Sequence, residues 1–429
     1  MSLLIRSGTV IDPANGVEGA RDVLVRDGRI AAVEEPGSIA ADGATIVDAQ
    51  DRWVVPGLID MHVHLREPGF EYRETITTGA RAAVAGGFAS VACMANTDPV
   101  NDSAAVTTAM LDRARASAPA RVFPIGAVSK GLRGEQLAEI GEMHAAGIVA
   151  VSDDGMPIMD GNLMRRALEY AAMFGLAVIA HEEDCNIASG GVMNEGEMSL
   201  RLGLRGMPAA AEDAMIARDI AILERTQGRL HVAHISTRGG VHLVREAKQR
   251  GLAVTAEAAP HHFTLTEHAV EGYNTNAKMK PPLRTEADVR AVRAGLIDGT
   301  IDAIATDHAP HHRDEKDVEF DKANDGIVGL ETALPLSLAL WREHGMERSR
   351  LIAALTVNPA RILGLDLGTL GVGCAADLTV IDPEAAWSVE PSAFRSKSRN
   401  TPFAGVEMVG RAAMTIVGGR VVWPEAQDA

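Results

Sequence analysis

The stretch VVPGLIDMHVH at residues 54–64 decides the fold, because a run of apolar residues ends there in two histidines. Seven further apolar runs follow and alternate with alanine-rich amphipathic segments, a pattern typical of parallel strands joined by helices. The eight runs lie at residues 54–63, 88–95, 122–128, 148–151, 176–180, 230–235, 253–259 and 301–305. Eight such units predict an α/β fold with a TIM-type (β/α)8 barrel, whose chemistry lies at the carboxyl ends of the strands.

The two ends of the chain follow a different pattern. Short apolar segments separated by turn residues occupy both ends, which predicts short strands. We expect these strands to pair into one small β domain. The predicted division is residues 1–55 and 365–429 for this domain, and residues 56–364 for the metal-dependent barrel.

Composition excludes several classes of function. Lys plus Arg number 41 against 58 for Asp plus Glu, a formal charge of −17, so most of the surface would repel phosphate backbones. Aromatic residues are only 3%, which disfavours base stacking. Cys93, Cys185 and Cys374 are too few and scattered for a disulfide framework, and no apolar stretch approaches the ~18 residues of a membrane span. We therefore expect a cytoplasmic protein that binds neither nucleic acid nor membrane.

Metal-binding residue types recur where the runs end. His62 and His64 are two apart on a strand, so both side chains point to the same side. Two hydrogen-bonded core histidines would be the alternative for this pair alone. Further histidines and carboxylates at other strand ends favour a metal site, and these are His181, His234, Asp154 and Asp307. Six imidazole and carboxylate ligands suit two divalent ions, zinc above all.

Such a pair of ions predicts hydrolysis. Two metals roughly 3.5 to 4 Å apart can bridge one water and lower its pKa from about 15.7 to about 7. The expected reaction is hydrolysis of a polarised carbonyl. Asp307 is the expected proton shuttle between the bridging water and a leaving nitrogen; the alternative role for Asp307 is that of a plain metal ligand.

Three residues placed just beyond strand ends are expected to recognise the substrate. Arg66 can grip a carboxylate with two hydrogen bonds, which would offset the negative charge of the chain. Asn96 and His311 complete this group. The alternatives are a surface salt bridge for Arg66 and a turn position for Asn96.

Several long motifs together resemble the amidohydrolase superfamily, and within it class I dihydroorotases, over essentially the whole chain. They are VPGLIDMHVHLREPG (55–69), SDDG (152–155), HIST (234–237), DHAPH (307–311), GIVGLET (326–332) and NPA (358–360). The resemblance implies a barrel with a β-sandwich built from the N- and C-terminal segments. It also implies reversible interconversion of (S)-dihydroorotate and N-carbamoyl-L-aspartate in de novo pyrimidine biosynthesis.

The resemblance also assigns roles by position. It implies that His62, His64, Asp154 and Asp307 hold one Zn²⁺ and that Asp154, His181 and His234 hold a second, with hydroxide and Asp154 bridging the two. Asp307 would be the catalytic acid/base. Substrate contacts would come from His64, Arg66, Asn96, His311 and the backbone around Asp325 and Gly326. The choice of Asp154 over Asp153 rests on the resemblance alone.

Two positions bear on the assignment within the superfamily. Lys280 stands before PPLR (281–284) where the family often has Asn, and we expect the lysine to contact the substrate through its charge. Hydantoinases and allantoinases bridge their metals with a carboxylated lysine where this chain has Asp153 and Asp154, which favours a dihydroorotase.

The alternatives are a dihydropyrimidinase or hydantoinase, and a non-catalytic barrel that scaffolds aspartate carbamoyltransferase. We expect a homo-oligomer, with aspartate carbamoyltransferase as a candidate partner.

Overall fold

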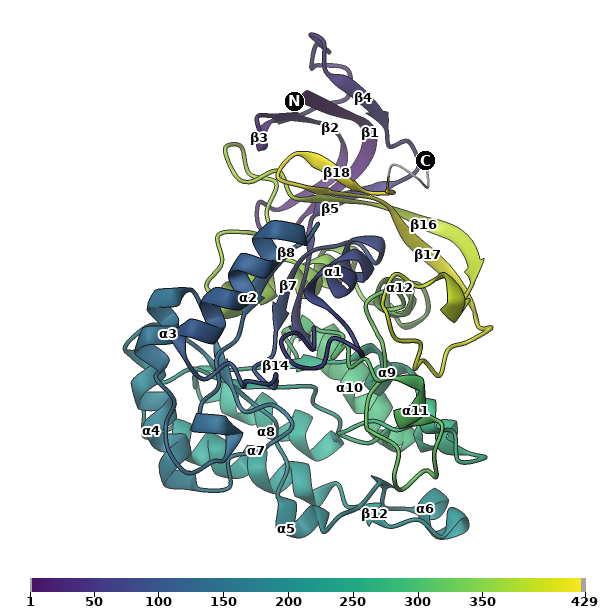
Figure 1. The fold of residues 1–429 in the computed structure, drawn as a ribbon. Helices are drawn as coiled ribbons and strands as arrows, with labels where there is room; N and C mark the ends of the chain where they lie inside the picture. Colours follow the sequence, from purple (N-terminus) through teal and green to yellow (C-terminus); the bar gives the residue numbers. More distant parts are fainter. Residues whose placement is uncertain (1, 426–429) are drawn as a thin grey trace.

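The structure, a computed structural model, describes residues 2–425. Strands from both ends of the chain pair into one sheet, drawn in purple and yellow in Figure 1. Its strands are β1 (Ser2–Asp12), β2 (Val17–Arg26), β3 (Arg29–Glu34), β4 (Thr45–Asp48), β5 (Trp53–Pro56), β16 (Leu378–Ser388), β17 (Glu407–Val417) and β18 (Arg420–Trp423). The order is β18-β17-β16-β5-β1-β2-β3, with β4 paired to β1. We call this assembly the terminal sheet.

The middle of the chain carries eight strands that pair in parallel. They are β6 (Leu58–Val63), β7 (Phe88–Cys93), β8 (Arg121–Pro124), β9 (Val151–Ser152), β10 (Val178–Ala180), β13 (Leu230–Val232), β14 (Val254–Ala258) and β15 (Ala303–Ile304). They form two sheets, β6-β7-β8 and β15-β14-β13-β10-β9. Parallel bridges between Gly126 and Val151 and between Val63 and His308 link the two sheets on both sides. Each predicted run overlaps one of these strands.

The first run, at residues 54–63, is two strands rather than one, so that part of the prediction was wrong. β5 belongs to the terminal sheet, whereas β6 belongs to the inner strands. Gly57 separates them: its amide donates to the Asp377 carbonyl at 2.8 Å, and a Cβ at this position would lie 2.5 Å from that of Ala89. The chain passes between the two sheets here because only glycine fits such a close approach.

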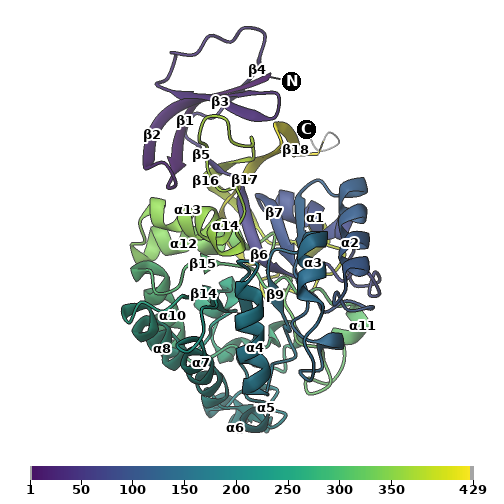
Figure 2. The same cartoon turned by 90° about the vertical axis from the view of Figure 1, so that its left-hand side faces the viewer.

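Helices surround the parallel strands, and Figure 2 shows the terminal sheet above this layer. The α-helices are α1 (Ile76–Ala85), α2 (Ala104–Ser117), α3 (Ile140–Ala146), α4 (Gly161–Ala172), α5 (Cys185–Ala188), α6 (Glu197–Leu202), α7 (Ala210–Leu223), α8 (Arg238–Gln249), α9 (Pro260–Thr264), α10 (Glu286–Asp298), α11 (Arg313–Lys316), α12 (Ala333–His344), α13 (Arg348–Leu355) and α14 (Val357–Leu363). Two short strands, β11 (Met193–Asn194) and β12 (Gly206–Met207), pair outside this layer. None of the helices within residues 2–425 has both the length and the apolar character needed to cross a membrane.

A buried ionic network fixes the chain just beyond β13, where His234 lies. Glu212 on α7 accepts hydrogen bonds from the amides of Ser236 at 2.8 Å and Thr237 at 3.0 Å. Arg284 lies 3.5 Å from Glu212 and donates to the Ser236 hydroxyl at 3.1 Å. Its guanidinium is almost fully buried, so its charge is balanced by these contacts rather than by water. The network therefore holds the end of β13 in place.

Replacing Arg284 by Met should lower the free energy of unfolding by about 3–5 kcal/mol, because the Glu212 carboxylate would remain buried without its partner. Chemical denaturation measures the change. The exposed Arg290, which is paired with Glu286 at 3.7 Å, provides the control, and Arg290→Met should cost less than about 1 kcal/mol. Equal effects of the two substitutions would contradict this role for Arg284.

Candidate active site

Six predicted metal ligands meet at the carboxyl ends of the parallel strands. His62 lies on β6 and His64 directly follows this strand, and each of the other ligands lies within three residues of the end of its strand. These are Asp154 after β9, His181 after β10, His234 after β13 and Asp307 after β15. All six side chains are buried. Parallel strands bring residues far apart in sequence together in this way.

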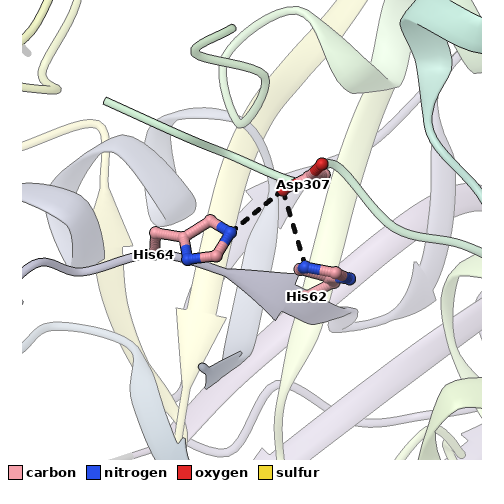
Figure 3. A group of neighbouring side chains, drawn as sticks. All are labelled: His62, His64 and Asp307. Carbon is pink, nitrogen blue, oxygen red and sulfur yellow. Dashed lines mark hydrogen bonds and ion pairs between the residues drawn. The ribbon is translucent and has the colours of Figure 1, made fainter. Parts of the chain in front are cut away.

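One half of the cluster lies around Asp307 (Figure 3). Asp307 Oδ1 is 3.1 Å from His64 Nε2 and 3.5 Å from His62 Nε2. Asp154 approaches the same two rings, with Oδ1 3.5 Å from His62 Nε2 and Oδ2 3.4 Å from His64 Nε2. The two histidines of β6 therefore share two carboxylates.

The other half of the cluster lies around Asp154. Asp154 Oδ1 is 3.3 Å from His234 Nε2 and 3.5 Å from His181 Nδ1, and these two nitrogens are 3.0 Å apart. Each of two sets, His62 with His64 and Asp307 and His62 with Asp154 and His234, offers three ligand atoms within 4.8 Å of one another. Asp154 lies between the two halves.

The donors fit divalent metal ions. His62 Nε2 is buried and has no hydrogen-bond partner within residues 2–425. Buried polar atoms normally have a partner, and a bound metal ion would supply the one that this nitrogen lacks. Burial is the largest single effect and would raise the pKa values of Asp154 and Asp307, but the charge of His62 and the contacts with neighbouring histidines together hold both below the ordinary range. Both carboxylates are therefore ionised, and their negative charges favour bound cations in this part of the site. Imidazole nitrogen with carboxylate oxygen is a donor set suited to zinc and similar ions.

Three outer side chains fix the orientation of the histidine rings. Glu257 Oε1 lies 2.5 Å from His62 Nδ1, Glu183 Oε2 lies 3.4 Å from His181 Nε2, and Asn96 Oδ1 lies 2.9 Å from His64 Nδ1. An acceptor on one ring nitrogen places the proton there and leaves the other nitrogen free to ligate a metal. Each ring then presents its lone pair to the cluster.

Sequence reasoning missed two of these residues, Glu257 and Glu183. A lone glutamate inside the apolar run at residues 253–259 was the available signal for Glu257, since a charged residue there needs a buried partner. Glu183 follows His181 by two positions, a spacing that carries no signal by itself. Asn96 was predicted to contact the substrate, and the structure shows it holding His64.

The structure separates Asp153 from Asp154. Asp153 points away from the cluster, where Oδ1 accepts from the amides of Val128 at 2.8 Å and Ser129 at 3.0 Å. Burial raises the pKa of Asp153 to about 6, although these hydrogen bonds oppose the rise. Of the two neighbours, only Asp154 faces the histidines.

Arg66 is a buried cation beside the cluster. Its Nε donates to the Pro310 carbonyl at 3.2 Å, and its Nη2 lies 3.4 Å from His311 Nε2. Within residues 2–425 no carboxylate lies within ion-pair distance of Arg66. Burial, followed by the charge of Arg66, lowers the pKa of His311 to about 2, so this imidazole is neutral at ordinary pH. The guanidinium thus retains hydrogen-bonding capacity for an anion.

The remaining predicted contacts lie around this point. Lys280 Nζ is 3.0 Å from Glu183 Oε1. The Asp325 carboxylate lies 3.8 Å from Lys278 Nζ, whereas its backbone carbonyl is 2.9 Å from His311 Nε2. A Cβ at Gly326 would lie 2.6 Å from His311 Cδ2, so the backbone approaches this ring closely. The backbone of residues 325–326, and not the Asp325 side chain, faces the site.

Three of the site residues have a left-handed backbone. The φ angles are 61° at Arg66, 30° at His234 and 46° at Asp307. Such conformations cost on the order of 1–3 kcal/mol for residues other than glycine and persist only where the surroundings enforce them. The fold therefore holds these side chains in place against local backbone preference.

Two family models and several curated proteins match this chain. A family model described as dihydro-orotase-like matches residues 51–240, and an amidohydrolase family model matches residues 323–423. A dihydroorotase from Anaeromyxobacter sp. (strain K) is 58% identical over 99% of this chain and 98% of its own. One from Geobacter sp. (strain M21) is 56% identical over 99% of each chain.

Two solved structures have a fold similar to that of this chain. An L-hydantoinase (dihydropyrimidinase) from Arthrobacter aurescens has a TM-score of 0.88 at 26% identity, covering 98% of this chain and 95% of its own. A D-hydantoinase (dihydropyrimidinase) from Thermus sp. has a TM-score of 0.84 at 25% identity, covering 98% and 94%.

Parallel strands that gather histidines and aspartates at their carboxyl ends define the class, which is the amidohydrolases. Within that class, identities of 55–58% over nearly the full chain settle the family. The chain belongs to the dihydroorotase family.

Asp153 and Asp154 give a matched pair of variants. Asp154→Asn should lose bound metal on dialysis, because it removes a charged donor from the centre of the cluster. Asp153→Asn should keep its metal and lose about 1–3 kcal/mol of stability, because the buried Ser129 hydroxyl, which donates to Asp153 Oδ2, loses its charged acceptor. Metal analysis and thermal unfolding measure the two outcomes. Metal loss in Asp153→Asn with retention in Asp154→Asn would contradict the assignment.

Proposed function

We propose that this chain is a dihydroorotase that opens the ring of (S)-dihydroorotate by hydrolysis to N-carbamoyl-L-aspartate and catalyses the reverse reaction in pyrimidine biosynthesis. Hydrolysis adds hydroxyl to the carbonyl carbon and a proton to the ring nitrogen as the C–N bond breaks. The observation that carries the proposal is Arg66, a buried guanidinium without a carboxylate partner beside the histidine–aspartate cluster. An anionic ring substrate would complete this arrangement.

The cofactor in this proposal is a pair of Zn²⁺ ions. His62, His64, Asp154 and Asp307 would hold one ion, and Asp154, His181 and His234 the other. Their nitrogen and oxygen atoms, and the unpartnered Nε2 of His62, support this assignment. Such ions supply Lewis acidity, which polarises a carbonyl and lowers the pKa of water to about 7.

The residues around Arg66 would bind the substrate. We assign the substrate carboxylate to the Arg66 guanidinium, whose remaining N–H groups can pair with both carboxylate oxygens. Neutral His311 can donate or accept a hydrogen bond at the same end. Further contacts would come from His64, Asn96, Lys280 and the backbone at Asp325 and Gly326, all of which border Arg66, His311 or the metal ligands.

Asp307 would be the catalytic acid/base. Its carboxylate faces His62 and His64 and so lies where the attacking water and the leaving nitrogen must meet. A carboxylate here can accept the proton of the water and pass it to the nitrogen. The low pKa of Asp307, to which His62 and His64 contribute, keeps it ionised, which is the form that can accept a proton.

The proposal also covers the domain architecture, the cellular compartment and the partners of the enzyme. We propose that the inner strands close into one (β/α)8 barrel over residues 56–364, supported by the bridges on both sides. Residues 1–55 and 365–429 would form a β-sandwich domain, supported by the shared terminal sheet. The three cysteines are free in the described residues, in keeping with a cytoplasmic enzyme. A homo-oligomer and a complex with aspartate carbamoyltransferase complete the proposal.

A hydantoinase is the second candidate, because solved structures of that name share the fold. A 5-substituted hydantoin without a carboxylate would leave Arg66 buried and unpaired, which costs free energy. A non-catalytic scaffold for aspartate carbamoyltransferase is disfavoured because all six proposed ligands are present and face one another.

Substrate preference tests the proposal. Zinc-loaded protein should hydrolyse dihydroorotate with kcat/KM at least about 100-fold above that for 5-substituted hydantoins, and a chelator should abolish turnover. A difference of this size corresponds to roughly 3 kcal/mol, which is ordinary for hydrogen bonds to a charged group. Loss of the ultraviolet absorbance of dihydroorotate follows the reaction. Faster turnover of hydantoins would favour the second candidate.

Asp307→Asn tests the proton transfer. We expect kcat to fall by about 100-fold or more, while most of the zinc stays bound to the other ligands. Asp314→Asn is the control, because Asp314 lies on the short helix α11 and is exposed. An active Asp307→Asn enzyme, or one that is inactive only because its zinc is lost, would contradict the role.

A further inference from the structure

A line of three side chains runs from the rim of the site to one half of the metal cluster. Lys280 Nζ lies 3.0 Å from Glu183 Oε1. The other oxygen, Glu183 Oε2, lies 3.4 Å from His181 Nε2. The opposite ring nitrogen, His181 Nδ1, faces Asp154 Oδ1 at 3.5 Å. One carboxylate therefore joins a lysine to a proposed metal ligand.

Burial along this line makes it unlike a surface salt bridge. The side chain of His181 is 3% exposed, that of Glu183 is 7% exposed and that of Lys280 is 31% exposed. Charges on buried groups are screened much less than charges in water. The ammonium of Lys280 therefore acts on Glu183, and through it on His181, with little attenuation.

The other histidines lack such a link. Glu257, which holds His62, has its second oxygen 3.2 Å from His231 Nε2, and Asn96, which holds His64, is uncharged. Within residues 2–425, the ion pairs join a lysine or arginine to an outer partner of a proposed metal ligand only at Glu183. The two halves of the cluster thus differ in electrostatic environment.

We propose that Lys280 is a positioning residue, which acts through Glu183 to lower the metal affinity of the half of the cluster that contains His181. This inference rests on the proposed metal centre. Glu183 strengthens metal binding, because a carboxylate on Nε2–H makes the imidazole a better donor. Lys280 opposes it in two ways: it draws the negative charge of Glu183 toward itself, and it adds a positive charge near the cation. Removal of Lys280 and removal of Glu183 therefore change metal affinity in opposite directions.

The two metal positions would then differ in metal affinity. The position of His62 and His64 would hold its ion tightly, whereas the position of His181 would exchange its ion more readily. Lys280 stands where the resemblance places a neutral Asn, so the ease of exchange is a property of this chain. The substrate contact proposed above for Lys280 would appear in KM, separately from zinc affinity.

Stepwise removal of zinc from the zinc-loaded enzyme by a competing chelator tests the inference. We expect Lys280→Met to tighten the weaker zinc position by about threefold or more and leave the tighter one unchanged. Lys280→Arg, which keeps the charge, should behave as the unaltered chain does. Glu183→Gln should weaken the same position by about 10-fold or more.

Lys248→Met is the matched control, since Lys248 is of similar exposure and pairs with Asp302 at 2.6 Å, without a histidine beyond it. Unchanged or weakened zinc binding in Lys280→Met, or an equal shift in Lys248→Met, would overturn the inference. Chelator titration measures metal binding directly, so these outcomes do not depend on turnover. Failure of the proposed activity would instead appear as zinc-loaded enzyme that does not turn over dihydroorotate.

Discussion

The burial of two carboxylates, Asp154 and Asp307, among four imidazole rings is the constraint on which the site depends. Charged groups removed from water need partners of opposite charge, and neighbouring protein groups supply only part of that charge. His62 lowers the pKa of both carboxylates, yet its own Nε2 has no hydrogen-bond partner among residues 2–425. Divalent cations would balance the carboxylates and give His62 Nε2 a partner. The proposed metal binding would thus compensate the buried charges of this cluster.

The fold meets this constraint by placing the ligands on rigid strand ends and orienting them from outside. Parallel strands deliver the six side chains from positions up to 245 residues apart, and Glu257, Glu183 and Asn96 hold three of the rings. The Glu212–Arg284 network fixes the segment after β13, where His234 adopts a left-handed backbone. Arg66 lies beside the cluster as a buried cation, and its positive charge favours an anion. The same surroundings therefore favour both cofactor and substrate.

Much of this was predictable from sequence, because the signals are local. Runs of apolar residues with a histidine or aspartate near the end mark a strand and a candidate ligand together, so the six residues that meet in the cluster and the strands near them could be named. Glu257 and Glu183 could not, since their roles depend on contacts with residues far away in the sequence. Spacing could not separate Asp153 from Asp154, which differ in the direction each side chain takes. The first run was misread as one strand because the passage between sheets at Gly57 depends on Ala89 and Asp377.

The central claim is that these six residues form one centre for two metal ions. The most direct test is anomalous diffraction at the zinc edge from crystals of the zinc-loaded protein. The account predicts two peaks in each chain, one among His62, His64 and Asp307 and the other beside His181 and His234, with Asp154 between them. Peaks elsewhere, or none at the ends of the parallel strands, would contradict it.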